Sequence, residues 1–304
     1  MGDNTNRQEP HKIEGLPRIL SVSCGDSFSA CVDSDGVVWC FGENGSGQLG
    51  LGHTTAQNKP TKVPGLPPIR SVHCGAYHTL CIDHNSELWA FGQNSKGQLG
   101  LGNSTQQNSP QKVPVTNISL ACCGGYFSTI QDNNGHVYSC GHNSYGQLGL
   151  GHKEQQNRFV RLSSLPDISS FSCGYYHQVF LTATGDALAV GYNGHGELGT
   201  GDNTSRSSAV KISALSNITH LSCGRNHTMA ISDKGQLYTF GYNGNGGLGT
   251  GDTQNRNSPQ ALPLQHACSL SHGLSHFTIV GDKNGKVWAF GYNDYGQLGI
   301  GSTQ

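Results

Sequence analysis

Histidine is the side chain in this sequence that is best suited to acid–base chemistry or metal binding near neutral pH. Several histidines recur at one position of a repeated pattern, where two further copies carry phenylalanine. These residues are His78, His177, His227 and His276, with Phe28 and Phe127 in the other two copies. A catalytic group is needed once, so four equivalent histidines favour a scaffold role. We predict that they pack on, or hydrogen-bond to, a neighbouring loop.

The eleven cysteines are the second group with chemical potential. Five of them occupy one repeat position: Cys24, Cys74, Cys123, Cys173 and Cys223. An odd number of cysteines without a CxxC pair argues against a disulfide framework or a zinc site. Free cysteine instead behaves as a small buried hydrophobe. We therefore predict reduced core thiols, no metal, and a cytoplasmic or nuclear location.

No sequence motif for a catalytic site accompanies these residues. An HExxH helix, a P-loop and a GxSxG nucleophile elbow are all absent from the sequence. The glycines stand in turn-like stretches, and none of these follows a strand and opens a helix, as a phosphate-binding loop does. We predict a non-enzymatic protein with no catalytic residues and no cofactor.

Composition argues against two further classes of partner. The formal net charge is −1, whereas a nucleic-acid or anionic-membrane surface normally needs a basic excess. No apolar run approaches the roughly 18 residues that cross a bilayer, and residues 1–15 contain no apolar segment of a secretory signal. We expect a monomer in the cytoplasm or nucleus, with no direct nucleic-acid binding and no membrane binding.

A recurring glycine-rich stretch indicates which elements position any site. Its first copy reads FGENGSGQLGLG. It occurs six times in related form, at residues 41–52, 91–102, 140–151, 190–201, 240–251 and 290–301. Successive copies lie 49 or 50 residues apart. A fixed period of this size indicates a solenoid or a propeller. We expect residues 1–304 to form a single β-propeller domain.

Each repeat contains four strand-like segments. In the first copy, residues 19–24 alternate between apolar and polar side chains, which is the period of a half-buried strand. Residues 28–32 and 37–41 flank an Asp-Gly hairpin signal. Residues 60–63 begin with proline, which suits an edge strand. Four antiparallel strands in each of six repeats indicate an all-β, closed propeller with six four-stranded blades.

The two ends of the sequence match in register. Gly2–Thr5 reads GDNT, as Gly201–Thr204 does, and residues 10–13 resemble an outer strand. The sixth copy ends soon after its glycine stretch. We therefore expect the N-terminal strand to complete the last blade and to close the ring without an open edge.

Tyrosines gather in one kind of loop. In an up-and-down blade, the turn between the first two strands and the glycine loop after the third strand lie at the same end. The predicted partner-binding face consists of Tyr77, Tyr126, Tyr145, Tyr175, Tyr176, Tyr192, Arg225, Tyr242, Tyr292 and Tyr295. The same loops carry Lys96, His142, His195 and Asp294. Because tyrosine and arginine dominate interfaces, we expect this face to bind a protein or an extended peptide. The alternative is that the tyrosines pack on neighbouring blades as part of the loop scaffold.

One repeat combines CGxxH, a strand, an Asp/Asn-Gly hairpin and FGxNxxGQLGxG, and this combination resembles the repeats of the regulator of chromosome condensation family. The resemblance covers nearly the entire chain, six times over. It implies a β-propeller. The founding member of that family is the nucleotide-exchange factor of the Ran GTPase and docks on chromatin, whereas many relatives are only interaction modules. The resemblance therefore implies the fold strongly and the activity weakly.

The sequence departs from the founding member in three respects. That protein has seven blades, whereas six repeats are present here. It also inserts a wedge against its GTPase, and steps of 49 or 50 residues leave no room for one. Its N-terminal tail is basic, unlike residues 1–15. We therefore predict a protein-interaction module; the alternative is a guanine-nucleotide exchange factor or another regulator of a small Ran-like GTPase.

Overall fold

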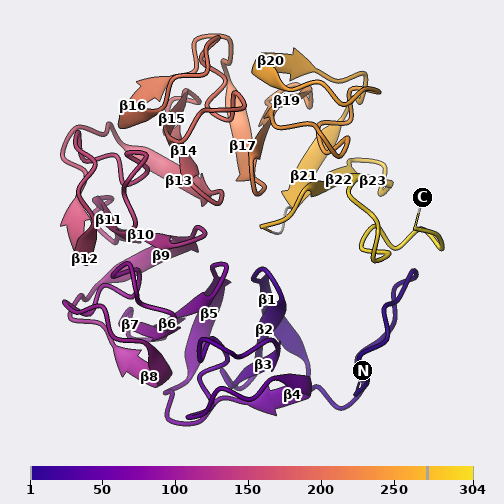
Figure 1. Ribbon diagram of the computed structural model, residues 1–304. Coiled ribbons are helices and arrows are strands. Elements are labelled where there is room, and N and C mark those ends of the chain that lie inside the picture. Colours follow the sequence, from indigo (N-terminus) through magenta and orange to yellow (C-terminus); the bar gives the residue numbers. More distant parts are fainter. Residues whose placement is uncertain (1, 272–273, 304) are drawn as a thin grey trace. The chain divides into compact units, whose positions relative to one another are not determined.

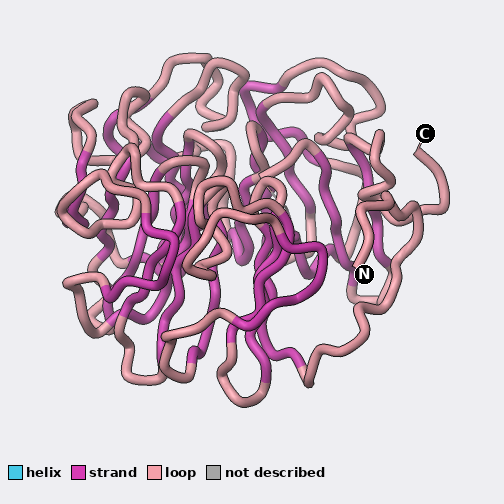
Figure 2. The backbone as a smooth tube through the Cα atoms, turned by 60° about the horizontal axis from the view of Figure 1, so that its bottom comes forward, coloured by secondary structure: helices cyan, strands magenta, loops and turns pink. Residues whose placement is uncertain are grey.

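The fold consists of strands joined by turns and loops. A computed structural model describes residues 2–271 and 274–303, and no helix occurs among them (Figure 2). The chain forms two compact units. Unit 1 comprises Met1–Thr5, Lys12–Asn143 and Glu154–Ser163, and unit 2 comprises Asn6–His11, Ser144–Lys153 and Ser164–Gln304.

Unit 1 contains three four-stranded antiparallel sheets, one from each of the first three repeats (Figure 1). The first consists of β1 (Ile19–Cys24), β2 (Phe28–Asp33), β3 (Val38–Gly42) and β4 (Gln57–Lys62). The second consists of β5 (Ile69–Cys74), β6 (His78–Asp83), β7 (Leu88–Gly92) and β8 (Gln107–Lys112). The third consists of β9 (Ile118–Cys123), β10 (Phe127–Asp132), β11 (Val137–Gly141) and β12 (Gln156–Arg161).

Unit 2 contains two four-stranded sheets and one three-stranded sheet among its described residues. The first consists of β13 (Ile168–Cys173), β14 (His177–Thr182), β15 (Ala187–Gly191) and β16 (Arg206–Lys211). The second consists of β17 (Ile218–Cys223), β18 (His227–Ser232), β19 (Leu237–Gly241) and β20 (Arg256–Ala261). The third consists of β21 (Ala267–Ser271), β22 (Phe277–Asp282) and β23 (Val287–Gly291).

Every sheet pairs strands that are adjacent in sequence, which is the up-and-down order of a propeller blade. This order confirms the predicted all-β propeller fold, with one blade for each repeat. The first three strands of the first repeat agree with their predicted segments to within one residue. The outer strand β4 begins at Gln57 rather than Pro60, because Gln57 already pairs with Gly42 of β3. Pro60 is tolerated there because β4 is the edge strand.

The sixth blade differs from the prediction. Its sheet has three strands, and residues 6–11 form no strand. This N-terminal segment lies beside the last glycine loop, where the Gly301 N–H donates to the Gln8 carbonyl at 2.8 Å. The prediction that it completes the sixth blade is therefore wrong. In the first repeat, the matching N–H of Gly52 donates to Asn108 of the next blade, so the register places residues 7–10 one blade further on.

The hydrophobic core lies between successive sheets. In unit 1, Val72 and Cys74 of β5 are buried in one cluster with Ala30 and Val32 of β2. Within unit 1, the first blade therefore buries one face against the first strand of the second blade. A single sheet of this kind would leave both apolar faces in water, which explains why the repeats need one another.

The cysteines are free, and most of them are buried. The buried group comprises Cys31, Cys40, Cys74, Cys81, Cys123, Cys140, Cys173 and Cys223, which confirms the prediction of core thiols for these residues. Burial raises the pKa of thiols such as Cys40 and Cys81, so they stay protonated. Cys24 is exposed, contrary to the prediction. It lies on β1, where Leu20 and Val22 are also exposed, at 62% and 72%.

Candidate protein-binding face

The turn after the first strand and the start of the glycine loop lie at the same end of each blade. Backbone hydrogen bonds join them directly. The Gln93 N–H donates to the Tyr77 carbonyl at 2.9 Å, and the Tyr192 N–H donates to the Tyr176 carbonyl at 2.9 Å. The two kinds of loop that carry the predicted site residues therefore share one end of each sheet, as the up-and-down order requires.

A buried asparagine anchors each glycine loop. These residues are Asn44, Asn94, Asn143, Asn193, Asn243 and Asn293. In the second repeat, Asn94 Oδ1 accepts the Leu99 N–H at 3.0 Å, while Asn94 Nδ2 donates to the carbonyls of Asn103 and Thr105 at 3.0 and 3.1 Å. One fully buried side chain thus satisfies backbone groups on both arms of the loop, which holds the loop in a fixed shape.

Seven aromatic rings of unit 2 form a chain of direct contacts, called here the aromatic chain. Its members, in order of contact, are Tyr175, Tyr176, Tyr145, Tyr192, His195, Tyr242 and, as a seventh ring, His276. Neighbouring ring centroids lie between 4.8 and 5.9 Å apart. Edge-to-face contacts of this kind are favourable beyond the area that they bury. The chain links the glycine loops of the third, fourth and fifth repeats.

Arg225 adds a cation to this cluster. Its guanidinium carbon lies 4.2 Å from the ring centroid of Tyr175, a favourable cation–π distance. Tyr175, one of the residues predicted to contact a partner, is 6% exposed. Its buried ring therefore supports the Arg225 guanidinium. Two backbone bonds fix the same turn, from Tyr175 N–H to the Arg225 carbonyl and from Arg225 N–H to the Ser275 carbonyl, both at 3.0 Å.

The other predicted tyrosines include two pairs in direct ring contact. Tyr77 and Tyr126 lie in unit 1 with ring centroids 5.7 Å apart, and the Tyr77 hydroxyl donates to Asp26 at 3.2 Å. Tyr292 and Tyr295 lie in unit 2, 6.0 Å apart, and Tyr295 is 60% exposed.

The additional polar residues also divide between the units. Lys96 and His142 lie in unit 1, where burial and then the charge of Lys96 lower the pKa of His142. Asp294 lies in unit 2, on the glycine loop of the sixth repeat, and is exposed. His195 belongs to the aromatic chain.

Glu197 is a residue of this face that the sequence prediction missed. Four other repeats carry glutamine at this position: Gln48, Gln98, Gln147 and Gln297. Glu197 is fully buried; its Oε2 accepts the His195 N–H at 2.9 Å, and its Oε1 accepts from Asn226 Nδ2 at 3.4 Å. Burial raises the pKa of Glu197 to about 7. The sequence signal that could have identified Glu197 is the replacement of the glutamine that four other repeats carry at this position.

The variant Glu197→Gln should remove a pH dependence of stability. The folded-state pKa lies above the unfolded value, so the folded state holds the proton more tightly, and stability falls as the pH rises toward about 7. We expect the wild type to lose on the order of 2–3 kcal/mol in unfolding free energy between pH 5 and pH 8 relative to the variant. Urea unfolding at both pH values measures this difference. The exposed control Glu43→Gln should behave like the wild type; parallel pH profiles for Glu197→Gln and the wild type would contradict the expectation.

The recurring histidines have a structural role, as predicted. His78 Nε2 lies 2.9 Å from Ser128 Oγ, and His177 Nε2 lies 3.0 Å from Thr228 Oγ1, each on the following blade. Burial lowers the pKa of both histidines to about 3, so they are neutral at physiological pH.

Two features are absent from the described residues. Within residues 2–271 and 274–303, no three His, Cys, Asp or Glu side chains come together in a group that could hold a metal ion. The same part of the chain contains no helix that could span a membrane.

The blades and the anchored glycine loops define the class of this protein, a β-propeller built from tandem 50-residue repeats. Comparison with family models shows which family of β-propellers the chain matches. Residues 1–279 match the RCC1-like domain, and residues 284–304 match the regulator of chromosome condensation (RCC1) repeat. The chain belongs to this family, as its repeat motif predicts.

Individual relatives share the fold. A curated human relative, Protein RCC2, is 43% identical over 54 residues, which are 17% of this chain and 10% of that protein. The crystal structure of human WBSCR16 superposes with a TM-score of 0.86 at 22% identity, over 98% of this chain and 82% of that one. Yeast RCC1 (Prp20), solved with bound Kap60, gives a TM-score of 0.82 at 21% identity, over 93% and 72% of the two chains.

Proposed function

We propose that this chain is a protein-interaction module that binds a protein or an extended peptide through the aromatic chain of unit 2. The observation that carries the proposal is the unbroken series of ring contacts, 4.8 to 5.9 Å apart, across the loop ends of neighbouring blades. Rings held in place by one another and by anchored loops lose little conformational freedom on binding. Such preorganised tyrosines give affinity at a low entropic cost.

Arg225 supplies the polar specificity of this proposed face. Its guanidinium is stacked on Tyr175 at 4.2 Å and is therefore oriented before binding. A planar, oriented guanidinium favours a carboxylate or a backbone carbonyl on the partner. Tyr145, which is 37% exposed, gives the partner an apolar surface beside it. The supported partner is a polypeptide that combines apolar side chains with acceptor groups.

The combined variant Tyr176→Ala, Tyr192→Ala and Arg225→Ala should lose partner binding. Loss of several aromatic and arginine anchors at one face typically costs 2 kcal/mol or more each, so we expect affinity to fall by at least about 100-fold. Binding partners are enriched on immobilised wild-type protein, identified by mass spectrometry, and each purified candidate is then titrated against both proteins by calorimetry.

A matched control separates loss of binding from loss of fold. Thr184→Ala, Lys234→Ala and Lys283→Ala change three exposed residues in the hairpins at the opposite end of the unit 2 blades. This control should keep full affinity, and both variants should melt cooperatively. Unchanged affinity of the Tyr176, Tyr192 and Arg225 variant would refute the proposed face.

A second candidate function is regulation of a small Ran-like GTPase, including nucleotide exchange. It is supported by the family and by a relative, Prp20p from Saccharomyces cerevisiae, whose structure is described with its binding properties to Gsp1p and histones. We rank it second because the equal repeat steps leave no inserted wedge. Both candidates are non-enzymatic binding functions and fit a cytoplasmic or nuclear protein.

Release of fluorescent GDP distinguishes the two candidates. Ran and a panel of related GTPases are loaded with the nucleotide and mixed with micromolar protein. Clear acceleration for one GTPase would establish exchange activity and replace the interaction module as the leading function. Release at the intrinsic rate for every GTPase would leave the interaction module as the better account.

A further inference from the structure

The rings of the aromatic chain touch one another and leave no gap between neighbours. Tyr145 lies 5.2 Å from Tyr176 and 4.9 Å from Tyr192, measured between ring centroids. A carbon atom inserted between two rings would need about 3.5 Å to each of them, so no side chain of a partner can enter there. The rings therefore form a platform, and not a cage that encloses a single cationic side chain.

Two glycines set the place of two of these rings. Gly194 and Gly244 each follow a tyrosine by two residues, in the repeated sequence YNG. A Cβ added at Gly194 would lie 3.1 Å from Tyr192 Cε1, and one added at Gly244 would lie 3.0 Å from Tyr242 Cε2. Both added atoms would lie closer still to the tyrosine hydroxyl. Each ring therefore lies across its glycine and occupies the space that a side chain would need.

The acidic side chains of the loops that carry these rings are buried or paired. In the fourth and fifth glycine loops they are Glu197, which is buried, and Asp202 and Asp252, each of which forms a 2.6 Å ion pair with the arginine four residues later. The cation Arg225 lies at the Tyr175 ring, 4.2 Å from its centroid. The platform therefore favours an uncharged ligand segment that carries an acidic group near Arg225.

The backbone beneath the rings is already engaged. The Tyr192 N–H donates to the Tyr176 carbonyl, and the Tyr242 N–H donates to the Asn226 carbonyl at 2.8 Å. Addition of a ligand strand needs a row of unpaired N–H and C=O groups, so it is disfavoured here. The ligand must bind through its side chains and through its own carbonyl groups.

Polar groups continue the platform beside His195. A pocket of about 310 Å³ lies there, and its lining includes His195 and the carboxamides of Asn203, Asn255 and Asn257. The Asn255 Nδ2 lies 3.4 Å from His195 Nδ1, so the pocket and the aromatic chain are continuous. Because carboxamides carry two N–H donors each, this pocket suits a ligand whose carbonyl groups are exposed.

We propose that the aromatic chain binds a proline-rich segment in the polyproline II conformation, with an acidic residue next to Arg225. This inference rests on the proposed function of the aromatic chain and names its partner. Polyproline II has no internal hydrogen bonds and a solvated backbone, so its carbonyls are open to donors. Its prolines dock on aromatic surfaces in a preformed conformation of low entropy. One turn rises about 9 Å over three residues, which is comparable to two successive ring spacings.

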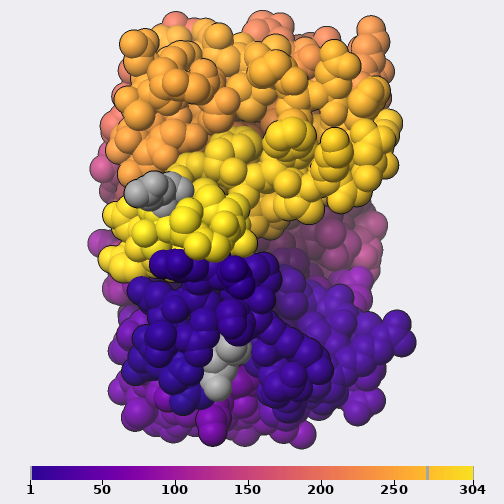
Figure 3. Space-filling model, turned by 90° about the vertical axis from the view of Figure 1, so that its right-hand side faces the viewer, coloured from indigo at the N-terminus to yellow at the C-terminus, as the bar shows by residue number. Residues whose placement is uncertain are grey.

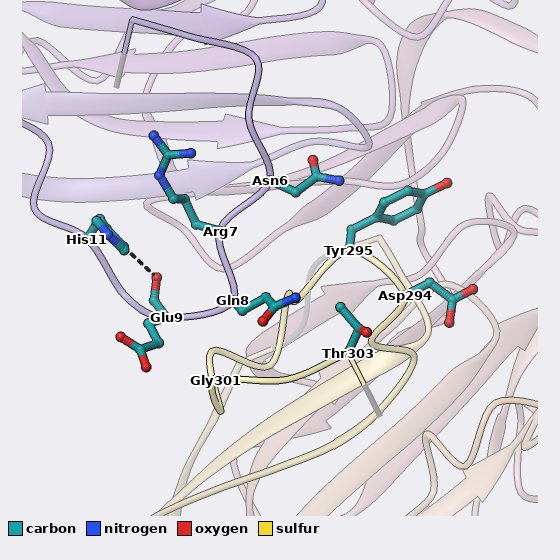
Figure 4. A pocket seen from close by; sticks show the side chains of 9 residues that line it. All are labelled: Asn6, Arg7, Gln8, Glu9, His11, Asp294, Tyr295, Gly301 and Thr303. Atoms are coloured by element: carbon teal, nitrogen blue, oxygen red, sulfur yellow. Dashed lines mark hydrogen bonds between the residues drawn. The ribbon is translucent and has the colours of Figure 1, made fainter.

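Tyr292 and Tyr295 provide an internal contrast. They lie on the glycine loop of the sixth repeat, whose surface (yellow) adjoins that of the fifth repeat (orange) in Figure 3. Asp294 takes the place of the glycine and accepts a hydrogen bond from Tyr292. Tyr295 borders a pocket together with Arg7 and Glu9 (Figure 4). Charged groups surround this pair, so we expect it to contribute nothing to the binding of a proline-rich segment.

Selection from a random library tests the partner class without presupposing it. Random peptides of about twelve residues, displayed on phage, are selected on the immobilised protein. We expect prolines three residues apart to occur at least about three times as often as in the unselected library, because they share one face of polyproline II. Asp or Glu should be enriched on one side of the prolines. Selected sequences without the proline enrichment would overturn the proposal.

Calorimetric titration of the strongest selected peptide locates its site. Tyr145→Ala removes an exposed ring of the platform. Gly194→Ala displaces the Tyr192 ring instead, because the φ angle of Gly194 is not positive and alanine fits its backbone. We expect each variant to weaken binding by at least about tenfold. Replacement of the peptide's prolines by alanine should weaken binding by a similar factor, because the preformed conformation is lost.

Tyr295→Ala is the matched control, since it removes a tyrosine that is 60% exposed on the same kind of loop. We expect its affinity to stay within about twofold of the wild type, and all three variants to melt as the wild type does. If Gly194→Ala does not fold, Tyr145→Ala alone decides the site. Equal losses for Tyr295→Ala and Tyr145→Ala would overturn the proposal.

The outcomes separate this inference from the proposed function. Selected peptides that lack proline but lose affinity for Tyr145→Ala would overturn the proline-rich ligand, and the aromatic chain would remain a peptide-binding face. Peptides that bind the wild type and Tyr145→Ala equally would overturn both, as would a library from which no binding peptide is selected.

Discussion

Replacement of Gly92 by alanine should destabilise the protein by about 4 kcal/mol or more, the largest loss that we expect from a single methyl group. Gly92 ends β7 with φ of +105°, a region that alanine rarely adopts. The added Cβ would lie 2.6 Å from the Tyr77 carbonyl oxygen and 2.7 Å from His78 Cα. Both are backbone atoms of the adjacent strand and its turn, so neither can move without breaking the sheet. Urea unfolding or a failure to express as folded protein measures the effect.

Gly45→Ala is the matched control for this prediction. Gly45 lies in a glycine loop of the same type, is exposed, and would place its new Cβ more than 4 Å from any neighbouring atom. We expect a change within about 0.5 kcal/mol. Equal stability of the Gly92 and Gly45 variants would show that the end of β7 tolerates a side chain and that its close packing is not essential.

The variant Asn94→Ala should have the second-largest effect, a loss of about 3 kcal/mol. The substitution removes the acceptor for the buried Leu99 N–H and the donor for the carbonyls of Asn103 and Thr105. Because Asn94 is fully buried, water cannot replace these bonds readily, and each unsatisfied group costs roughly 1–3 kcal/mol. Urea unfolding gives the total, and hydrogen exchange of the loop amides shows whether the loop opens locally.

Asn85→Ala tests whether this loss is specific to the anchoring position. Asn85 belongs to the same repeat but lies exposed in its hairpin, so its replacement should change stability by less than about 0.5 kcal/mol. If Asn94→Ala were as stable as this control, the glycine loops would be held by their backbone turns alone.

Local signals in the sequence were sufficient for the repeat, the strands and the blade order. Strand alternation, Asp-Gly hairpins and turn glycines act over a few residues, and their recurrence every 49 or 50 residues repeats the evidence six times. The same reasoning correctly assigned the recurring histidines to the scaffold, because a catalytic group is not repeated around a fold. The glutamine position could also have revealed Glu197, because a buried acid stands out against glutamine in four other repeats.

The burial of individual residues depends on contacts between repeats, which the sequence does not show. The same motif has different environments in different copies: Val38 is buried and Val287 is exposed, although both begin the third strand of a blade. Cys24 is exposed, whereas Cys74 is buried in one cluster with residues of the preceding sheet.

The N-terminal segment shows the same limit of sequence reasoning. The register of residues 2–13 was recognised, but the place of this segment depends on long-range contacts such as the bond between Gly301 and Gln8. The tyrosines likewise share one kind of loop in the sequence, while the structure shows which of their rings are in contact, as in the aromatic chain. The sequence alone determined the repeating unit, because local backbone preferences specify it. The tertiary structure decided which surfaces remain open, because burial depends on neighbours that are distant along the chain.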